Sequence, residues 1–199
     1  MLSSNVSPDE VVNGTKVVAV VGASKNPEKE AFSVPLYLME NGFVIIPVNP
    51  SADAIHGVKA FPSLAQLPAE IAGNVEVVEV FRPSEELPDI ARQVVEMKKR
   101  TGKTAIFWAQ LGLKSVEAEQ ILKGEGVPYV MDGCMRTQHQ EYSRRKTTGS
   151  RGVNASWHER NPMPRNPTKK ERVEWHLAHV KECGCRKVPT SLSADMASL

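Results

Sequence analysis

The residues from Gly22 to Pro27 directly follow an apolar run and have the types that bind phosphate. The loop opens with a glycine, a hydroxyl and an amine in Gly22, Ala23, Ser24 and Lys25, and Lys29 adds a second positive charge. Backbone N–H groups, hydroxyls and lysine amines can all donate to phosphate oxygens. Only the first glycine of the dinucleotide pattern G-x-G-x-x-G is present, with Ser24 at the second position. The loop therefore indicates phosphate binding without selecting a nucleotide.

The end of the next apolar run narrows the choice of ligand. NAD sites place an Asp or Glu there to accept from the ribose hydroxyls, but this sequence has Pro47-Val48-Asn49-Pro50. Without that carboxylate, a ribose that carries a phosphate meets no repelling charge, which favours CoA or NADP over NAD. NADP sites add a nearby Arg, whereas Lys59 is the only Lys or Arg between Val48 and Pro62. The residue types favour CoA and leave NADP as the alternative.

Two histidines and two cysteines near the C-terminus have the types that bind zinc. His176, His179 and Cys183 stand at i, i+3 and i+7, which places two imidazoles and a thiol on one face of a helix. Gly184 would turn the chain so that Cys185 completes a tetrahedral His₂Cys₂ set. The Cys-x-Cys spacing is tighter than in common zinc fingers, so an ordinary helix with exposed histidines and free thiols stays open.

Cys134 admits a catalytic interpretation. Asp132 and His139 lie close to it in the sequence, and a thiol assisted by a base is a nucleophile. A small thiol at the end of a strand also packs well in a core, and the sequence shows no partner geometry. We therefore expect an inert, buried cysteine and no catalytic residue.

The elements that must position these residues alternate between strands and helices. Five short apolar runs, at residues 17–21, 43–48, 75–81, 103–109 and 127–131, are separated by amphipathic stretches. The unbroken run at 17–21 is typical of a strand buried on both faces. The alternation predicts an α/β fold, a doubly wound, five-stranded parallel sheet of the Rossmann-like type. Ligands bind such sheets outside the carboxyl ends of the strands, where Gly22 and Asn49 stand.

Three serines are predicted to begin helices of this domain. Ser33, Ser84 and Ser115 each precede an amphipathic stretch and have the hydroxyl that caps a helix. After Ser84, apolar residues recur at i, i+3, i+7 and i+10 from Leu87 to Met97. This spacing predicts one buried stripe on that helix.

Beyond residue 140 the pattern changes, and the chain divides into three predicted parts. Residues 1–140 form the domain, 141–167 a basic linker or arm, and 168–199 a short helix with the candidate metal site and a tail. Thr168 and Glu171 fit a capping box that predicts a helix over about 169–182. Residues 141–199 hold 12 Lys and Arg against 6 Asp and Glu. Between Glu141 and Arg172 the excess is nine Lys and Arg against three Asp and Glu, which could contact nucleic acid, and the tail could also dock a protein partner. A solvated arm is the simpler interpretation, because between these two residues only Trp157 interleaves with the charges.

Length and composition limit which classes of protein this chain can belong to. The 199 residues have room for one α/β domain with an appendage, and therefore for one nucleotide-scale site. No apolar run approaches the length that spans a bilayer, and the N-terminus has no basic flank before a long apolar stretch. Three cysteines do not make a disulfide framework. We expect a cytoplasmic protein without membrane contact, and leave open whether it forms a homo-oligomer.

Several stretches, taken in order, resemble one family. They are VAVVGAS (18–24), IPVNP (46–50), G-x-K-x-F-P-S-L (57–64), VEVFRP (78–83), WAQLG (108–112) and MDGCM (131–135). Their order and spacing resemble the stand-alone CoA-binding proteins related to the CoA-binding domain of succinyl-CoA synthetase α subunits and acyl-CoA synthetases. The resemblance covers about residues 17–139.

The resemblance implies a ligand, CoA or acyl-CoA, and a set of residues around it. These are Gly22, Ala23, Ser24, Lys25, Ser33, Asn49, Pro50, Phe81, Arg82, Gln110 and Gly112. The Gly22 loop would bind the diphosphate, Arg82 a phosphate, and Phe81 and Pro50 would offer apolar faces. A synthetase also needs a phosphorylated histidine domain and an ATP-binding partner, for which this chain has no room. The resemblance therefore implies binding, without synthetase activity.

Three interpretations remain for the function. The first is a CoA or acyl-CoA binding module, non-catalytic or regulatory, whose tail docks a partner or a metal. The second is an NADP-dependent oxidoreductase on the same sheet, and the third a nucleic-acid-associated protein that uses its basic arm. The missing fingerprint glycines and strand-end Arg count against the second, and the scarcity of aromatic residues counts against the third.

Overall fold

The computed structural model describes residues 3–147, 155–164 and 167–182, which belong to two compact units. The first unit spans residues 1–140 and the second residues 141–199. In the described part of the chain, no helix has both the length and the apolar character needed to cross a membrane.

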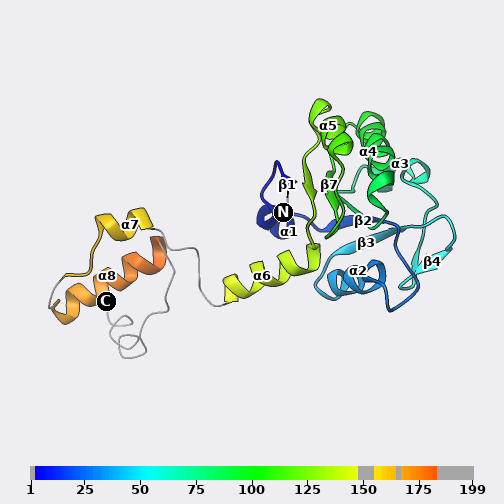
Figure 1. Ribbon diagram of the computed structural model, residues 1–199. Helices are drawn as coiled ribbons and strands as arrows, with labels where there is room; N and C mark the ends of the chain where they lie inside the picture. The colour runs from blue at the N-terminus through cyan, green and yellow to red at the C-terminus, as the bar shows by residue number, and fades with distance from the viewer. Residues whose placement is uncertain (1–2, 148–154, 165–166, 183–199) are drawn as a thin grey trace. The chain divides into compact units, whose positions relative to one another are not determined.

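Strands and helices alternate through the first unit, as the apolar runs predict (Figure 1). The strands are β1 (Ser3–Ser4), β2 (Val17–Val21), β3 (Val44–Val48), β4 (Ala54–Ile55), β5 (Val58–Lys59), β6 (Val77–Val80), β7 (Ile106–Ala109) and β8 (Tyr129–Met131). The helices are α1 (Pro8–Gly14), α2 (Glu30–Glu40), η1 (Leu64–Gln66), α3 (Ala69–Ala72), η2 (Ser84–Glu86), α4 (Leu87–Thr101) and α5 (Val116–Gly124), followed by α6 (Met135–Thr147), which continues past residue 140.

The main sheet has the order β1-β8-β7-β6-β2-β3. Strands β3, β2, β6, β7 and β8 run parallel, which confirms the five-stranded parallel sheet. The short β1 adds a sixth, antiparallel strand at the β8 edge that the sequence did not predict. It pairs through Ser3 and Ser4, and two residues without an apolar pattern give no strand signal.

The helices cover both faces of this sheet, as a doubly wound fold requires. Residues of η1, α3, α4 and α5 share one apolar core with Ala19, Val78, Phe107 and Tyr129 of the strands. The chain moves from β2 to β3 in one direction and from β6 to β8 in the other, and right-handed crossovers therefore place α2 on the opposite face. Buried Val34 and Leu38 fix α2 there.

Two of the predicted helix starts differ from the structure. Ser115 caps α5 as predicted, because its hydroxyl accepts from the Ala118 N–H at 3.2 Å. Ser33 is not a cap: α2 begins at Glu30 with Lys29 at the N-cap position, so Ser33 lies within the helix. Ser84 begins the η2 turn, and Glu86 stands at the N-cap of α4. Both serines are therefore already within helical winding, Ser33 in the first turns of α2 and Ser84 in the η2 turn that leads into α4.

The second unit contains two further helices, α7 (Ala155–Arg160) and α8 (Lys169–Glu182). The capping box of α8 is confirmed, because the Thr168 N–H donates to Glu171 Oε2 at 2.8 Å and the Glu171 N–H donates to Thr168 Oγ1 at 3.3 Å. Residues 141–167, expected to be a linker or arm, contain the end of α6 and the whole of α7. Trp157 of α7 packs against Trp175 and His179 of α8, a contact that no local pattern could predict.

Candidate functional site

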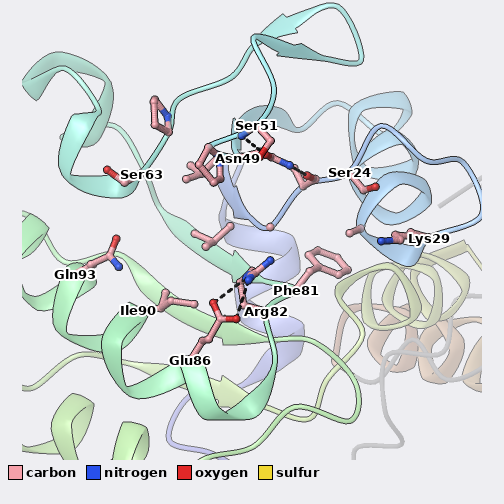
Figure 2. A pocket seen from close by; sticks show the side chains of 17 residues that line it. Ser24, Lys29, Asn49, Ser51, Ser63, Phe81, Arg82, Glu86, Ile90 and Gln93 are labelled. Carbon is pink, nitrogen blue, oxygen red and sulfur yellow. Dashed lines mark hydrogen bonds and ion pairs between the residues drawn. The ribbon is translucent and has the colours of Figure 1, made fainter.

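A cavity of about 450 Å³ lies at the carboxyl ends of β2, β3 and β6 (Figure 2). In the sheet, β3 lies on one side of β2 and β6 on the other. The connections that leave these strands therefore diverge, and the crevice between them is the place where doubly wound sheets bind ligands. The volume is within the range of small-molecule sites, about 300–1,000 Å³.

The cavity brings together most of the residues named from the sequence. Seven of the eleven line it: Gly22, Ala23, Ser24, Asn49, Pro50, Phe81 and Arg82. They come from three segments that are separated by more than twenty residues along the chain. Parallel strands place their carboxyl ends at one edge of the sheet, which is why the Gly22 loop and Asn49 meet Phe81 and Arg82, the two residues that only the family resemblance had indicated.

The loop after β2 is held in shape by its own hydrogen bonds. Gly22 has φ +85°, a backbone conformation that residues other than glycine rarely adopt. Its N–H donates to Val48 O at 2.9 Å, and the Ser24 N–H donates to Ala31 O at 3.0 Å. The Ser24 hydroxyl accepts from the Asn26 N–H at 3.0 Å. This bond uses the oxygen of the hydroxyl and leaves its hydrogen to donate to a ligand.

Asn49 joins the end of β3 to this loop. Its amide Nδ2 donates to Ala23 O at 2.7 Å, and its Oδ1 accepts from the Ser51 N–H at 2.7 Å (Figure 2). The side chain therefore fixes the spacing of the two loops that border the cavity. An aspartate would place a carboxylate beside the Ala23 carbonyl, where two acceptors repel each other.

Arg82 and Glu86 form an ion pair inside the cavity. Arg82 Nε and Nη2 donate to the two carboxylate oxygens of Glu86 at 2.9 and 2.7 Å. These hydrogen bonds hold the pKa of Glu86 below its ordinary value. Phe81, immediately before Arg82, is half-buried and lines the cavity, so it is neither a pure core residue nor fully exposed.

The positive charge of the cavity comes from Arg82, from Lys29 and from the start of α2. Lys29 and Ala31, at the first turn of α2, both line the cavity. The N-terminus of a helix carries a partial positive charge that attracts anions. Glu86 partly offsets these charges, because it is a carboxylate among the lining residues. The surroundings suit a phosphate-bearing ligand.

Several lining residues were not assigned to the site from the sequence. They include Ser51, Pro62, Ser63, Glu86 and Gln93, together with Lys29, for which the sequence indicates only a positive charge near the loop. Pro62 and Ser63 belong to the G-x-K-x-F-P-S-L stretch, and Glu86 stands four residues after Arg82. The i, i+4 spacing of an acid and a base was a usable signal for the ion pair.

Four residues named from the sequence do not line the cavity. Lys25 is exposed in the loop, and Ser33 accepts from Arg136 Nη1 at 3.2 Å. Gln110 is buried and donates through Nε2 to Glu79 Oε1 at 3.5 Å. Gly112 donates its N–H to Asp132 Oδ1 at 2.6 Å in a separate loop. Their assignment to the ligand stays a prediction.

Glu79 is a buried acid that the sequence reading missed. It lies in β6 opposite Val20 and Trp108 in the sheet register and has no exposed surface. Burial raises its pKa from 4.5 to about 8, against a smaller opposite effect of the Arg136 charge. The run VEVVEVF contains two acids, Glu76 and Glu79, and only Glu79 is buried. The sequence pattern alone does not distinguish them.

The zinc prediction falls partly outside the described residues. Cys183 and Cys185 lie outside the described residues. His176 and His179 belong to α8, and their ring centroids are 6.4 Å apart. His179 is buried and stacks on Trp175 at 4.7 Å. Within the described ranges, no group of three or more His, Cys, Asp or Glu is arranged to hold a metal ion. Metal binding by the four residues stays a prediction.

The catalytic interpretation of Cys134 gains no support from its neighbours. Cys134 is a half-buried free thiol just before α6. His139 Nδ1 lies 2.9 Å from the Tyr37 hydroxyl, and its ring packs edge-on against Phe43. Burial, with the charge of Lys16, lowers the pKa of His139. The imidazole thus serves a contact between α6 and α2.

The fold and the position of the cavity define a doubly wound domain of the class that binds nucleotides at its topological switch point. Within that class, the chain belongs to the CoA binding domain family, whose model matches residues 16–140. This match confirms the resemblance found in the sequence.

Individual proteins are similar to parts of this chain. The chain is 40% identical over 130 residues to the uncharacterized protein YneT of Bacillus subtilis, covering 65% of this chain and 90% of that one. It is 35% identical over 83 residues to an ADP-forming acetate–CoA ligase II of Archaeoglobus fulgidus, covering 41% of this chain but only 12% of the ligase. A solved structure from Thermus thermophilus matches with 33% identity and a TM-score of 0.60, covering 69% of this chain and 99% of that one.

Proposed function

We propose that the first unit binds CoA or an acyl-CoA in the cavity at the ends of β2, β3 and β6, as a non-catalytic or regulatory module. The observation that carries this proposal is the set of groups around the cavity. The Gly22 loop, the start of α2, Lys29 and Arg82 offer donors and positive charge to phosphates, and Asn49 stands where an NAD site has an acid.

The two ends of CoA suit different parts of the lining. The diphosphate would lie against the Gly22 loop and the first turn of α2, since both present donors to anions. Phe81, Pro50 and Pro62 offer apolar surface for the adenine ring or the pantetheine arm. The ligase relative supports the same ligand class, because its name states a CoA substrate.

A thermal-shift series tests this proposal. The full chain is melted with CoA, acetyl-CoA, NAD or NADP, each at the same concentration. A ligand present at about one hundred times its Kd stabilises by roughly 2.7 kcal/mol, or on the order of 5–10 °C for a chain of this size. We expect this shift with CoA or acetyl-CoA and none with NAD. A shift with NADP and none with either CoA ligand would refute the proposal in favour of an oxidoreductase.

Matched arginine variants locate the site. Arg82→Ala removes a guanidinium from the cavity, whereas Arg92→Ala removes an exposed one from α4 that does not line it. We expect Arg82→Ala to lose most of the CoA-induced shift and Arg92→Ala to keep it. Equal losses in both variants would place CoA elsewhere on the molecule.

A further inference from the structure

Arg82 is held at its charged end by a two-point contact with Glu86. Both carboxylate oxygens accept from the guanidinium, one from Nε and one from Nη2 (Figure 2). Two parallel hydrogen bonds fix the plane of the guanidinium as well as its position. The backbone of Glu86 is fixed in the η2 turn, because its N–H donates to Pro83 O at 2.9 Å.

The aliphatic stem of Arg82 is held by Gly22. A Cβ placed on Gly22 would lie 2.9 Å from Arg82 Cδ and 3.3 Å from Cγ, and 3.4 Å from the carbonyl carbon of Phe81. The stem therefore lies directly over the glycine that opens the phosphate loop. Only a residue without a side chain leaves this space, so Gly22 serves Arg82 in addition to allowing the turn at φ +85°.

The contact with Glu86 leaves part of the guanidinium available. A guanidinium has five N–H groups, of which Glu86 takes the Nε hydrogen and one Nη2 hydrogen. One Nη1 hydrogen and the second Nη2 hydrogen form another edge that can bind a phosphate with two bonds. Both residues line the cavity, and their side chains stay 48% and 44% exposed, so a ligand can reach this edge.

We propose that Glu86 is a positioning residue that orients Arg82 over Gly22 to bind the diphosphate of the ligand. This inference rests on the proposed function. A carboxylate in a phosphate site is otherwise unfavourable, since it repels the ligand. Its benefit is that Arg82 is ordered before the ligand arrives, and ordering a long side chain on binding costs about 0.5–1.5 kcal/mol.

Calorimetric titration of the full chain with CoA and with dephospho-CoA tests the inference. Glu86→Gln keeps the size of the side chain but replaces one accepting oxygen by a donor, so it cannot hold Arg82 at two points. We expect Glu86→Gln to bind both ligands about two- to tenfold more weakly, the factor that the ordering cost implies. The control is Glu85→Gln, which loses the same charge in the same turn but does not line the cavity. It should bind as the wild type does.

A double-mutant cycle separates positioning from a general loss of structure. If Glu86 acts through Arg82, Glu86→Gln should have no further effect on affinity in an Arg82→Ala background. An equal loss in both backgrounds would overturn the inference. Tighter binding by Glu86→Gln, which would mean that the carboxylate competes with the ligand, would also overturn it, as would unchanged affinity. A wild-type chain that binds neither ligand refutes the proposed function itself.

Discussion

Glu79→Gln should make the stability of this protein less dependent on pH. The side chain lies within β6 with no exposed surface, and Oε2 has no hydrogen-bond partner among the described residues. Burial disfavours the charged carboxylate and raises its pKa from 4.5 to about 8. Glutamine has nearly the same shape and carries no charge at any pH, so it removes the titration without opening a cavity.

The direction and size of the effect follow from proton linkage. Because the folded-state pKa is the higher one, the folded protein keeps a proton that the unfolded chain releases between about pH 4.5 and pH 8. Stability from this group is therefore lost as pH rises through that window, at up to about 1.36 kcal/mol per pH unit. Between pH 6 and pH 8 the wild type should lose about 2 kcal/mol relative to Glu79→Gln.

Urea unfolding followed by circular dichroism at several values from pH 5 to pH 9 measures this difference. The matched control is Glu96→Gln, which removes an exposed carboxylate of α4 that pairs with Lys99. We expect the control to follow the wild-type curve and Glu79→Gln to give a flatter one. Parallel curves for wild type and Glu79→Gln would show that Glu79 is ionised in the folded protein, and would refute the reasoning.

Four further predictions concern other parts of the chain. Gly22→Ala should cost about 1–2 kcal/mol of stability, because the residue has a positive φ, and should also weaken CoA binding by displacing the Arg82 stem; melting and titration measure the two effects. Trp108→Phe should lower the free energy of unfolding by about 1–3 kcal/mol, because the Gly133 carbonyl loses the indole N–H that donates to it in a buried contact. A smaller loss of stability in urea unfolding would mean that water replaces the donor. Ser115→Ala should cost about 1 kcal/mol through the loss of the α5 cap, and an unchanged urea midpoint would contradict this. If the tail binds zinc, metal analysis of purified protein should show one equivalent that a Cys183→Ser/Cys185→Ser double variant lacks; equal metal content in both removes the proposal.

The site was found from the sequence only as far as local signals reach. Gly22 and Asn49 each follow an apolar run, and the rule that parallel strands end at one edge of the sheet predicts that they lie together. Arg82 is indicated only by the family resemblance. Glu86 and Ser63 do not stand directly after an apolar run, so the strand-end rule does not indicate them. Gln110 shows the opposite case: it follows a strand in the same way, yet its amide is turned inward to Glu79.

The sequence by itself determined the five parallel strands, the caps at Ser115 and Thr168, and the CoA-binding family. These depend on residues that are neighbours along the chain, so hydrophobic runs, capping hydroxyls and motif order reveal them. Only the tertiary structure decided that the Arg82 stem covers Gly22, that Glu79 is buried against Gln110, and that Trp157 packs on α8. Such contacts join segments that are distant in sequence, and their energy depends on burial and direction, which no local pattern encodes.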